Sequence, residues 1–548
     1  MAFLKGNTIN LRYVVSLCVW CVILLYPQFV YAYIHNRGIS YICTGLVFLS
    51  PVFVIAMVLP RKWMYCAFVV VCSICSIIEL TMVDLYSGYL LPGAIISTLW
   101  TNQQEASEFY RTNIHEVYRW LPILLLCFAA CLCYKNVKLN KWIYVAVILL
   151  LLSPVAFVKY KLNYFYRETP ITLRYYLAKR VLNRPPYNVV YASVGAWRTL
   201  DKRKKIDTAS SICFNAHRDM IPSQKEIYVL AIGESLRYAN VSLNGIYTRS
   251  TTPRLETYNN LILFDNYYSQ ACLTMYSVPM LITRATPLDY ELNYAERSIV
   301  EPFRECGFKT YVLVNSNLLA EENYLSYGCD SLIVVPNMVE NNEIISGDKT
   351  IVHIIDSLAS QHDKLFVLCQ FLGNHGFYTN YDTSCDVYHP NSNDDGALIS
   401  LVSLANAYDN SILYTDYILD TLIRTIDRPL TLSAMMFVSD HGEDISFNGC
   451  GHGGNCDPPE LEYHVPLIFW WSDMYSNRNP ETIENAVMHK TSKLNGDCIF
   501  YSACAMAGIK IDSIYDEPNW NILSPQFCEH ERLILVSDGV TTINPDKR

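Results

Sequence analysis

The chain has 548 residues, of which 51% are hydrophobic and 17% are charged, and its formal net charge is −9. This length exceeds that of one ordinary domain, and the apolar content excludes an intrinsically disordered protein. Residues 1–160 carry 11 basic and 5 acidic side chains, whereas the rest of the chain carries 31 basic and 46 acidic ones. The acidic character of the second part argues against a nucleic-acid partner, because phosphate backbones attract basic surfaces.

Five apolar stretches predict that residues 1–160 form an α-helical transmembrane domain with five spans. All approach the length of about 20 residues that a helix needs to cross the bilayer. The stretches are residues 11–33, 40–60, 63–83, 120–134 and 142–158. The fourth is short, but it carries Trp120 and Tyr134 at its ends, where aromatic residues favour the membrane interface. A signal peptide is the alternative for the first stretch, although no cleavage site of small residues follows it.

Basic residues in the connections predict the orientation of these spans. Lys5 and Arg12 precede the first span, Arg61 and Lys62 follow the second, and three lysines follow the fourth. These segments should face the cytoplasm, so we expect a cytoplasmic N-terminus. An odd number of crossings then places everything after the fifth span outside the cytoplasm. The next segment, residues 161–222, is predicted to be an amphipathic connector along the membrane surface.

Eleven of the 20 cysteines lie in the polar part of the chain, without the repeated spacing of a zinc finger. This usage favours an oxidising compartment with some disulfide bonds, whose pairing the sequence leaves open. One hypothesis is a bridge between Cys450 and Cys456 across the loop that contains His452.

Residues 223–548 have the pattern of an α/β domain with a mainly parallel central sheet. Short β-branched and apolar runs alternate with helical patterns, which is typical of βαβ units. The longest predicted helix covers residues 398–426. The predicted strands are residues 227–232, 310–314, 365–370, 434–438 and 465–470.

Polar residues follow three of these strands directly. Glu234 comes after the first strand, His375 after the third, and Asp440 and His441 after the fourth, while His452 lies in a glycine-rich loop shortly beyond. Each residue alone has an ordinary structural explanation, such as a helix cap or a surface loop. Because ligands collect at the carboxyl ends of parallel strands, the set together predicts a catalytic zinc site with one open position.

Three segments of the chain resemble the membrane-bound phosphoethanolamine transferases, which include lipid A modifying enzymes and mobile colistin-resistance proteins. The segments are 271–279, which contains Thr-x-Tyr-Ser-x-Pro, 406–417, and 439–443, which reads Ser-Asp-His-Gly-Glu. The family's Gly-Thr-Ser before the nucleophile is replaced here by Ala271, Cys272 and Leu273. Gln270 and Met280 stand where the family often has cysteines. The resemblance implies an alkaline-phosphatase-like domain in the periplasm, attached to the bacterial inner membrane by several spans.

The resemblance also implies roles for individual residues. Thr274 would be the nucleophile, and Glu234, Thr274, Asp440 and His441 would surround one tightly bound zinc ion. His375 and His452 match the catalytic histidines that the family uses around the transferred phosphate or a second zinc ion. The substrate-binding residues implied are Thr101, Glu105, Asn315, His375 and His452.

The reaction implied is the transfer of phosphoethanolamine from phosphatidylethanolamine through a covalent intermediate on Thr274. The acceptor would be a phosphate or hydroxyl group of a periplasmic glycolipid, such as lipid A or the lipopolysaccharide core, and the enzyme would act as a monomer in polymyxin resistance. The alternatives are a phosphoglycerol transferase and a sulfatase-like hydrolase of the same fold. A receptor with an inactive phosphatase fold is disfavoured because no ligand of the set is missing.

Overall fold

The computed structural model describes two compact units: the first comprises Met1–Ile96 and Ala106–Trp197, and the second comprises Ser97–Glu105 and Arg198–Arg548. Each unit is considered by itself. The described residues are 11–59, 61–86, 88–100, 110, 114, 117–134, 149, 152–154, 156–160, 184–203, 213–315, 328–335, 338–340, 343–376, 378, 383–391, 394, 400–445, 452–453 and 458–547. The predicted domain boundaries at residues 160 and 222 stay predictions.

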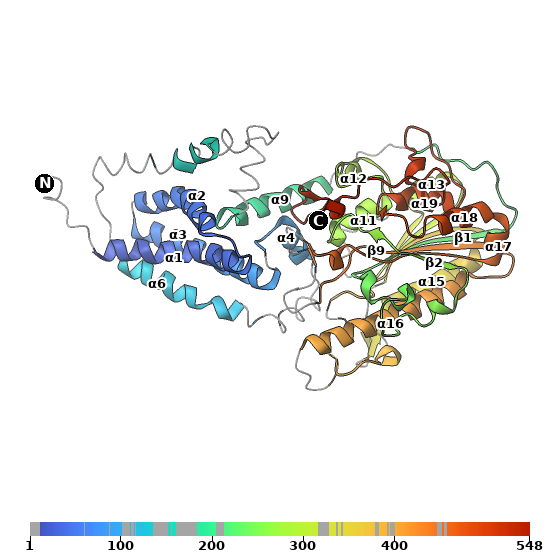
Figure 1. The fold of residues 1–548 in the computed structure, drawn as a ribbon, viewed down its shortest axis with the longest axis horizontal. Helices are drawn as coiled ribbons and strands as arrows, with labels where there is room; N and C mark the ends of the chain where they lie inside the picture. Colours follow the sequence, from blue (N-terminus) through green and yellow to red (C-terminus); the bar gives the residue numbers. More distant parts are fainter. Residues whose placement is uncertain are drawn as a thin grey trace. The chain divides into compact units, whose positions relative to one another are not determined.

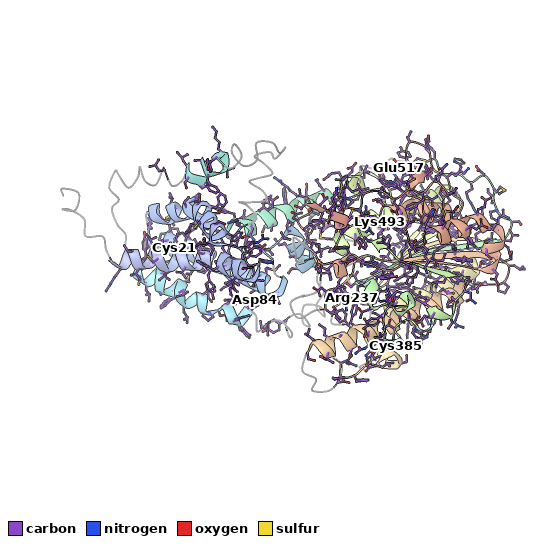
Figure 2. All side chains as sticks on the ribbon, viewed as in Figure 1. Cys21, Asp84, Arg237, Cys385, Lys493 and Glu517 are labelled. Atoms are coloured by element: carbon purple, nitrogen blue, oxygen red, sulfur yellow. The ribbon has the colours of Figure 1, made fainter. Side chains whose placement is uncertain are left out.

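The N-terminal unit is helical (Figure 1). Its described helices are α1 (Leu11–Ile34), α2 (Ile39–Val58), α3 (Lys62–Tyr86) and α6 (Pro122–Cys133), together with the first residues of α4 (Pro92–Trp100) and most of α9 (Tyr187–Arg203). α1 packs against α2, α3 and α6 around the buried rings of Trp20 and Tyr65. Asp84, labelled in Figure 2, accepts a hydrogen bond of 2.6 Å from the indole of Trp120.

Two helical stretches of this unit, Val14–Ile34 and Lys62–Leu85, are long and apolar enough to cross a membrane. Ile39–Val52 and Val117–Cys133 are apolar but shorter, and most of the predicted span at 142–158 lies outside the described residues. Five spans are therefore not confirmed, and the predicted multi-pass topology stays a prediction.

The second unit is built on a seven-stranded sheet with the order β2-β10-β9-β1-β8-β4-β5. The strands are β1 (Lys225–Gly233), β2 (Leu261–Phe264), β4 (Lys309–Val314), β5 (Ser331–Val334), β8 (Lys364–Gln370), β9 (Thr431–Ser439) and β10 (Leu467–Trp471). β1 pairs in parallel with β8 and β9, and β4 pairs in parallel with β5 and β8. β10 runs antiparallel to β9 and β2, so the sheet is mixed.

Helices cover both faces of this sheet, which explains why its central strands are apolar runs without polar alternation. Tyr228, Leu230 and Ile232 of β1 pack in one core layer, with α11 (Thr274–Ile282), α13 (Val300–Glu305) and α19 (Cys498–Met506). The intervening side chains of β1 pack in the other layer, with α15 (Gly347–Gln361) and α16 (Leu401–Ile426). The two sets of helices lie on opposite sides of the strands in Figure 1.

The five predicted strands and the long predicted helix are confirmed, with ends shifted by up to three residues. β2 and β5 were not predicted, because a strand of only four residues is too short to give a clear apolar pattern. In the described part of the chain no cysteine forms a disulfide bond, so the disulfide bonds expected from the cysteine usage are not found there. Cys450 and Cys456 lie outside the described residues.

A buried ion pair fixes the start of β1. Arg218 donates to both carboxylate oxygens of Glu226, at 2.9 and 2.6 Å, and the two side chains are 5% and 0% exposed. Removing one member of such a pair leaves the other charge buried without compensation.

We therefore expect Arg218→Ala to lower the free energy of unfolding by about 3–5 kcal/mol. The control is Arg424→Ala, which breaks an ion pair with Asp420 in which the arginine is 70% exposed, so its loss of stability should be much smaller. Urea unfolding of the detergent-solubilised chain, followed by tryptophan fluorescence, measures both. Equal losses would contradict the prediction.

Candidate active site

The candidate site lies where three neighbouring parallel strands end. β9, β1 and β8 are adjacent, with Gly233 opposite Ser439 and Ile232 opposite Gln370. Glu234 therefore leaves β1 beside Asp440 and His441, which leave β9. The loop after β8 starts on the other side of β1 and contains His375. The register of the sheet thus delivers these side chains to one edge.

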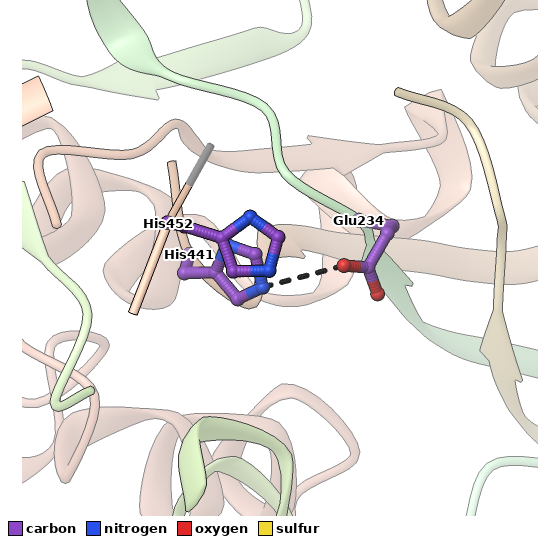
Figure 3. Close-up of side chains that lie close together, drawn as sticks. All are labelled: Glu234, His441 and His452. Carbon is purple, nitrogen blue, oxygen red and sulfur yellow. Dashed lines mark ion pairs between the residues drawn. The ribbon is translucent and has the colours of Figure 1, made fainter. Parts of the chain in front are cut away.

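Glu234, His441 and His452 form a group in which one ligand atom of each residue lies within 4.8 Å of the others (Figure 3). Nε2 of His441 lies 3.3 Å from Oε1 of Glu234 and 3.3 Å from Oδ2 of Asp440. The rings of His441 and His452 face each other, with their centroids 3.9 Å apart. Glu234, Asp440 and His441 are buried, and the side chain of His452 is 23% exposed.

Thr274 joins this group from the first position of α11. Its Oγ1 lies 3.2 Å from Oε1 of Glu234 and 3.1 Å from Nε2 of His441. The carbonyl oxygen of Leu273, just before the helix, accepts the N–H groups of Tyr276 and Ser277 at 2.9 Å each. This first turn fixes the direction of the Thr274 side chain, and the N-terminus of the helix favours negative charge.

Hydrogen bonds orient the atoms that face the group. Nδ1 of His441 lies 2.9 Å from the carbonyl oxygen of Gly442, so it acts as the donor and leaves Nε2 facing the carboxylates. Oδ1 of Asp440 accepts the backbone N–H groups of Ser235 and His441, at 3.1 and 2.7 Å. Oδ2 of Asp440 is buried and accepts no hydrogen bond from the described residues. That oxygen is available to a cation.

The charges of the group act strongly on one another. Burial raises the pKa of Asp440, and the nearby Glu234 carboxylate raises it further. Burial by itself lowers the pKa of His441, but Asp440 and Glu234 raise it to about 10. Burial would raise the pKa of Glu234, but the hydrogen bond and charge of His441 lower it. Two buried carboxylates held together need a positive charge, and carboxylate oxygens with one imidazole nitrogen suit zinc.

The segment with His452 is held against Leu273, in the loop just before α11. His452 Nδ1 lies 3.1 Å from Oε2 of Glu443, and the N–H of Gly453 donates to Oε2 of Glu462 at 2.8 Å. Burial raises the pKa of Glu462 to about 8. Gly453 has a φ of +70°, and a Cβ atom there would lie 2.2 Å from a methyl group of Leu273. Close packing therefore requires glycine at this position.

His375 belongs to a loop that is fixed by two neighbours. Asp348 accepts the N–H groups of Leu372 and Gly373, at 2.9 and 3.1 Å, and Asn374 donates to Ser411 of α16 at 2.6 Å. His375 is partly exposed and lies close enough for its charge to lower the pKa of Glu234, behind burial and His441. It is therefore at the rim of the site.

The remaining predicted residues lie apart from this group or outside the described residues. Asn315 follows β4, is buried, and donates to Asp348 at 2.7 Å, so it supports the His375 loop from behind. Thr101 and Glu105 lie outside the described residues. The substrate-binding roles of all three stay predictions.

Sequence reasoning missed the residues that support the group from behind, chiefly Ser235, Tyr408, Glu443 and Glu462. Tyr408 lies within the segment 406–417, which resembles the phosphoethanolamine transferases. The resemblance of this segment implied no role for Tyr408. The sequence carried one signal, the polar residues that recur along this otherwise apolar helix. The structure shows that these residues are buried: Asn406, Asp409, Asn410 and Asp416.

Comparison with known proteins shows what this domain resembles. Residues 226–494 match the Sulfatase family model. The integral membrane lipooligosaccharide phosphoethanolamine transferase A (EptA) of Neisseria meningitidis has the same fold, with a TM-score of 0.71 and 18% identity over 94% of this chain and 98% of that one.

Two further comparisons are with phosphoethanolamine transferases of Escherichia coli. The phosphoethanolamine transferase EptA of Escherichia coli is 26% identical over 319 residues, which are 54% of this chain and 56% of that one. The C-terminal periplasmic domain of EptC from Escherichia coli, solved as a complex with Zn, matches with a TM-score of 0.53 and 23% identity over 61% of this chain and 95% of that domain. The chain is thus similar to the phosphoethanolamine transferases, which confirms the resemblance that the three sequence segments indicated. It spans about half the length of the curated relatives that it matches, 46% to 56% in the first of them.

The packing of Gly453 generates a prediction for Gly453→Ala. The new methyl group would collide with Leu273 and force the His452 segment away from the loop just before α11. Gly245→Ala is the matched control, because Gly245 has a φ of +71° with no atom within 4 Å of its Cβ position. We expect Gly453→Ala to lower the free energy of unfolding by about 1–3 kcal/mol more than the control, as measured by urea unfolding. Equal losses would mean that the two loops are not packed together.

Proposed function

We propose that this chain is a zinc-dependent transferase that moves phosphoethanolamine from phosphatidylethanolamine to a phosphate or hydroxyl group of a periplasmic glycolipid, such as lipid A or the lipopolysaccharide core. The observation that carries the proposal is the position of Thr274, whose hydroxyl lies 3.1 Å from Nε2 of His441 and 3.2 Å from Glu234. A threonine hydroxyl is a weak nucleophile unless neighbouring groups activate it.

The residues that would hold zinc are Glu234, Thr274, Asp440 and His441. Oδ2 of Asp440, which accepts no hydrogen bond from the described residues, and Nε2 of His441, which faces it at 3.3 Å, support this assignment, and the EptC domain solved with Zn has the same fold. When bound, the ion would lower the pKa of the hydroxyl group and offset negative charge on the phosphate. A second zinc ion beside His375 or His452 is compatible with their positions.

The chain's own residues account for the remaining steps. In the first half-reaction, Oγ1 of Thr274 loses its proton to water and forms a bond to phosphorus, the bond from phosphorus to the glycerol oxygen breaks, and diacylglycerol leaves. In the second, an acceptor oxygen attacks the same phosphorus and the bond from phosphorus to Oγ1 breaks, which frees Thr274, whose oxygen regains a proton from water. His375 and His452, at the rim, would give a proton to the departing oxygen and take one from the entering group. The N-terminus of α11 would favour the phosphate.

A membrane anchor fits this chemistry, because extracting a two-chain lipid costs about 0.8 kcal/mol for each methylene exposed to water. The candidate spans in α1 and α3 would keep the active site at the bilayer surface. We propose a bacterial inner-membrane protein with a five-span domain (1–160), an amphipathic connector (161–222) and a periplasmic catalytic domain (223–548), acting as a monomer. Thr101 and Glu105 of the extracytoplasmic loop, with Asn315, would contact substrate.

Thr274→Ala should abolish transfer, because it removes the attacking oxygen, whereas Thr274→Ser keeps an oxygen and should retain part of the rate. The assay uses the full chain in vesicles that contain phosphatidylethanolamine with a labelled head group. Mass spectrometry of the quenched wild-type protein should find phosphoethanolamine on the peptide with Thr274. Undiminished transfer by Thr274→Ala, or a glycerol phosphate adduct on the wild type, would overturn the proposal.

Chelation provides an independent test of the metal. Dialysis against a strong chelator should remove transfer activity, and zinc should restore it, because a bound cation would offset the buried carboxylates and activate the Thr274 hydroxyl group. Elemental analysis before and after dialysis measures the metal content, with Asp440→Asn as the variant expected to bind zinc more weakly. Full activity in protein free of zinc would disprove this part of the proposal.

A further inference from the structure

A tyrosine of α16 holds the loop that carries Glu234. The hydroxyl group of Tyr408 donates a hydrogen bond of 2.7 Å to the carbonyl oxygen of Ser235 and accepts one of 3.0 Å from the N–H of Arg237. Tyr408 is fully buried and lies 173 residues from Ser235 along the chain. One phenol oxygen therefore bridges both ends of the short turn that follows Glu234.

Ser235, the first residue of this turn, links two of the proposed zinc ligands. The Ser235 hydroxyl donates to Oε1 of Glu234 at 3.1 Å, and its backbone N–H donates to Oδ1 of Asp440 at 3.1 Å. Ser235 has a φ of +56°, in the left-handed region that residues other than glycine rarely adopt. Such a conformation persists only where surrounding contacts impose it. The hydrogen bond from Tyr408 to the Ser235 carbonyl group is a contact of this kind.

The ring of Tyr408 is itself held in place on two sides. Tyr378 packs edge-on against it, with ring centroids 4.8 Å apart and an interplanar angle of 79°. The guanidinium group of Arg237, labelled in Figure 2, lies 5.2 Å from the ring centroid. Arg237 also donates to Asn240 at 2.6 Å and to the carbonyl oxygen of Glu443 at 3.3 Å. The phenol is thus fixed before any metal binds.

We propose that Tyr408 is a positioning residue of the metal site: through Ser235, it holds the Glu234 and Asp440 carboxylates in the orientation that binds the cation. The proposal rests on the metal site of the proposed function and assigns a role to one hydroxyl group that touches neither ion nor substrate. Partners of this kind, which orient ligands from behind, typically change metal affinity by about 10–100-fold.

Tyr408→Phe removes only this hydroxyl group and keeps the ring. The matched control is Tyr475→Phe, which removes another buried hydroxyl group that donates to a backbone carbonyl, that of Met506 at 2.9 Å. Both variants should lose similar thermal stability. The distinguishing measurement is zinc affinity of the full chain in detergent, determined by competition with a chromogenic chelator after metal removal.

We expect Tyr408→Phe to lower zinc affinity by about 10–100-fold and Tyr475→Phe to leave it unchanged. Unchanged affinity in Tyr408→Phe, or equal losses in both variants, would overturn the role of Tyr408. Absence of zinc binding by the wild type would overturn the proposal together with the metal site. Because the readout is binding, a wild type that binds zinc but transfers no phosphoethanolamine would disprove the proposed function and leave this inference standing.

Discussion

The mutual repulsion of Glu234 and Asp440 is the constraint on which the candidate site depends. The two carboxylates are buried at the ends of adjacent parallel strands, with one imidazole, that of His441, between them. Burying two such groups together costs free energy unless a positive charge accompanies them. Protonated His441 supplies one charge, and Oδ2 of Asp440 still lacks a hydrogen-bond donor among the described residues. A divalent cation would satisfy both carboxylates and leave the imidazole neutral, as metal ligation requires.

The rest of the unit holds this unfavourable arrangement in place. The parallel register of β9, β1 and β8 sets the spacing of the ligands, and α11 brings Thr274 to them at its first turn. Behind the ligands, two carboxylates accept hydrogen bonds from main-chain N–H groups and so fix the loops. Asp348 holds the loop of His375, and Glu462 holds the segment of His452. Sites that store electrostatic strain need such rigid support, because a relaxed loop would separate the charges.

The sequence predicted the parts of this architecture that follow from local patterns of apolar residues and from a general rule about parallel sheets. Apolar runs located β1, β4, β8, β9 and β10, and the rule that ligands gather at strand ends predicted that Glu234, Asp440 and His441 would meet. Thr274 was placed with them by family resemblance alone, because nothing in its local pattern points to the sheet edge. The support by Tyr408 and the collision at Gly453 depend on contacts between distant segments, which only the fold reveals. The antiparallel β10 was also beyond prediction, since strand direction depends on the path of the intervening chain.

The most direct test of the account is the location of bound zinc in crystals of the full chain, by anomalous diffraction at the zinc absorption edge. The account predicts a strong peak among Glu234, Asp440 and His441, with the Thr274 hydroxyl group in contact with the ion. A zinc peak elsewhere, or a Thr274 side chain turned away from an ion at this place, would contradict it.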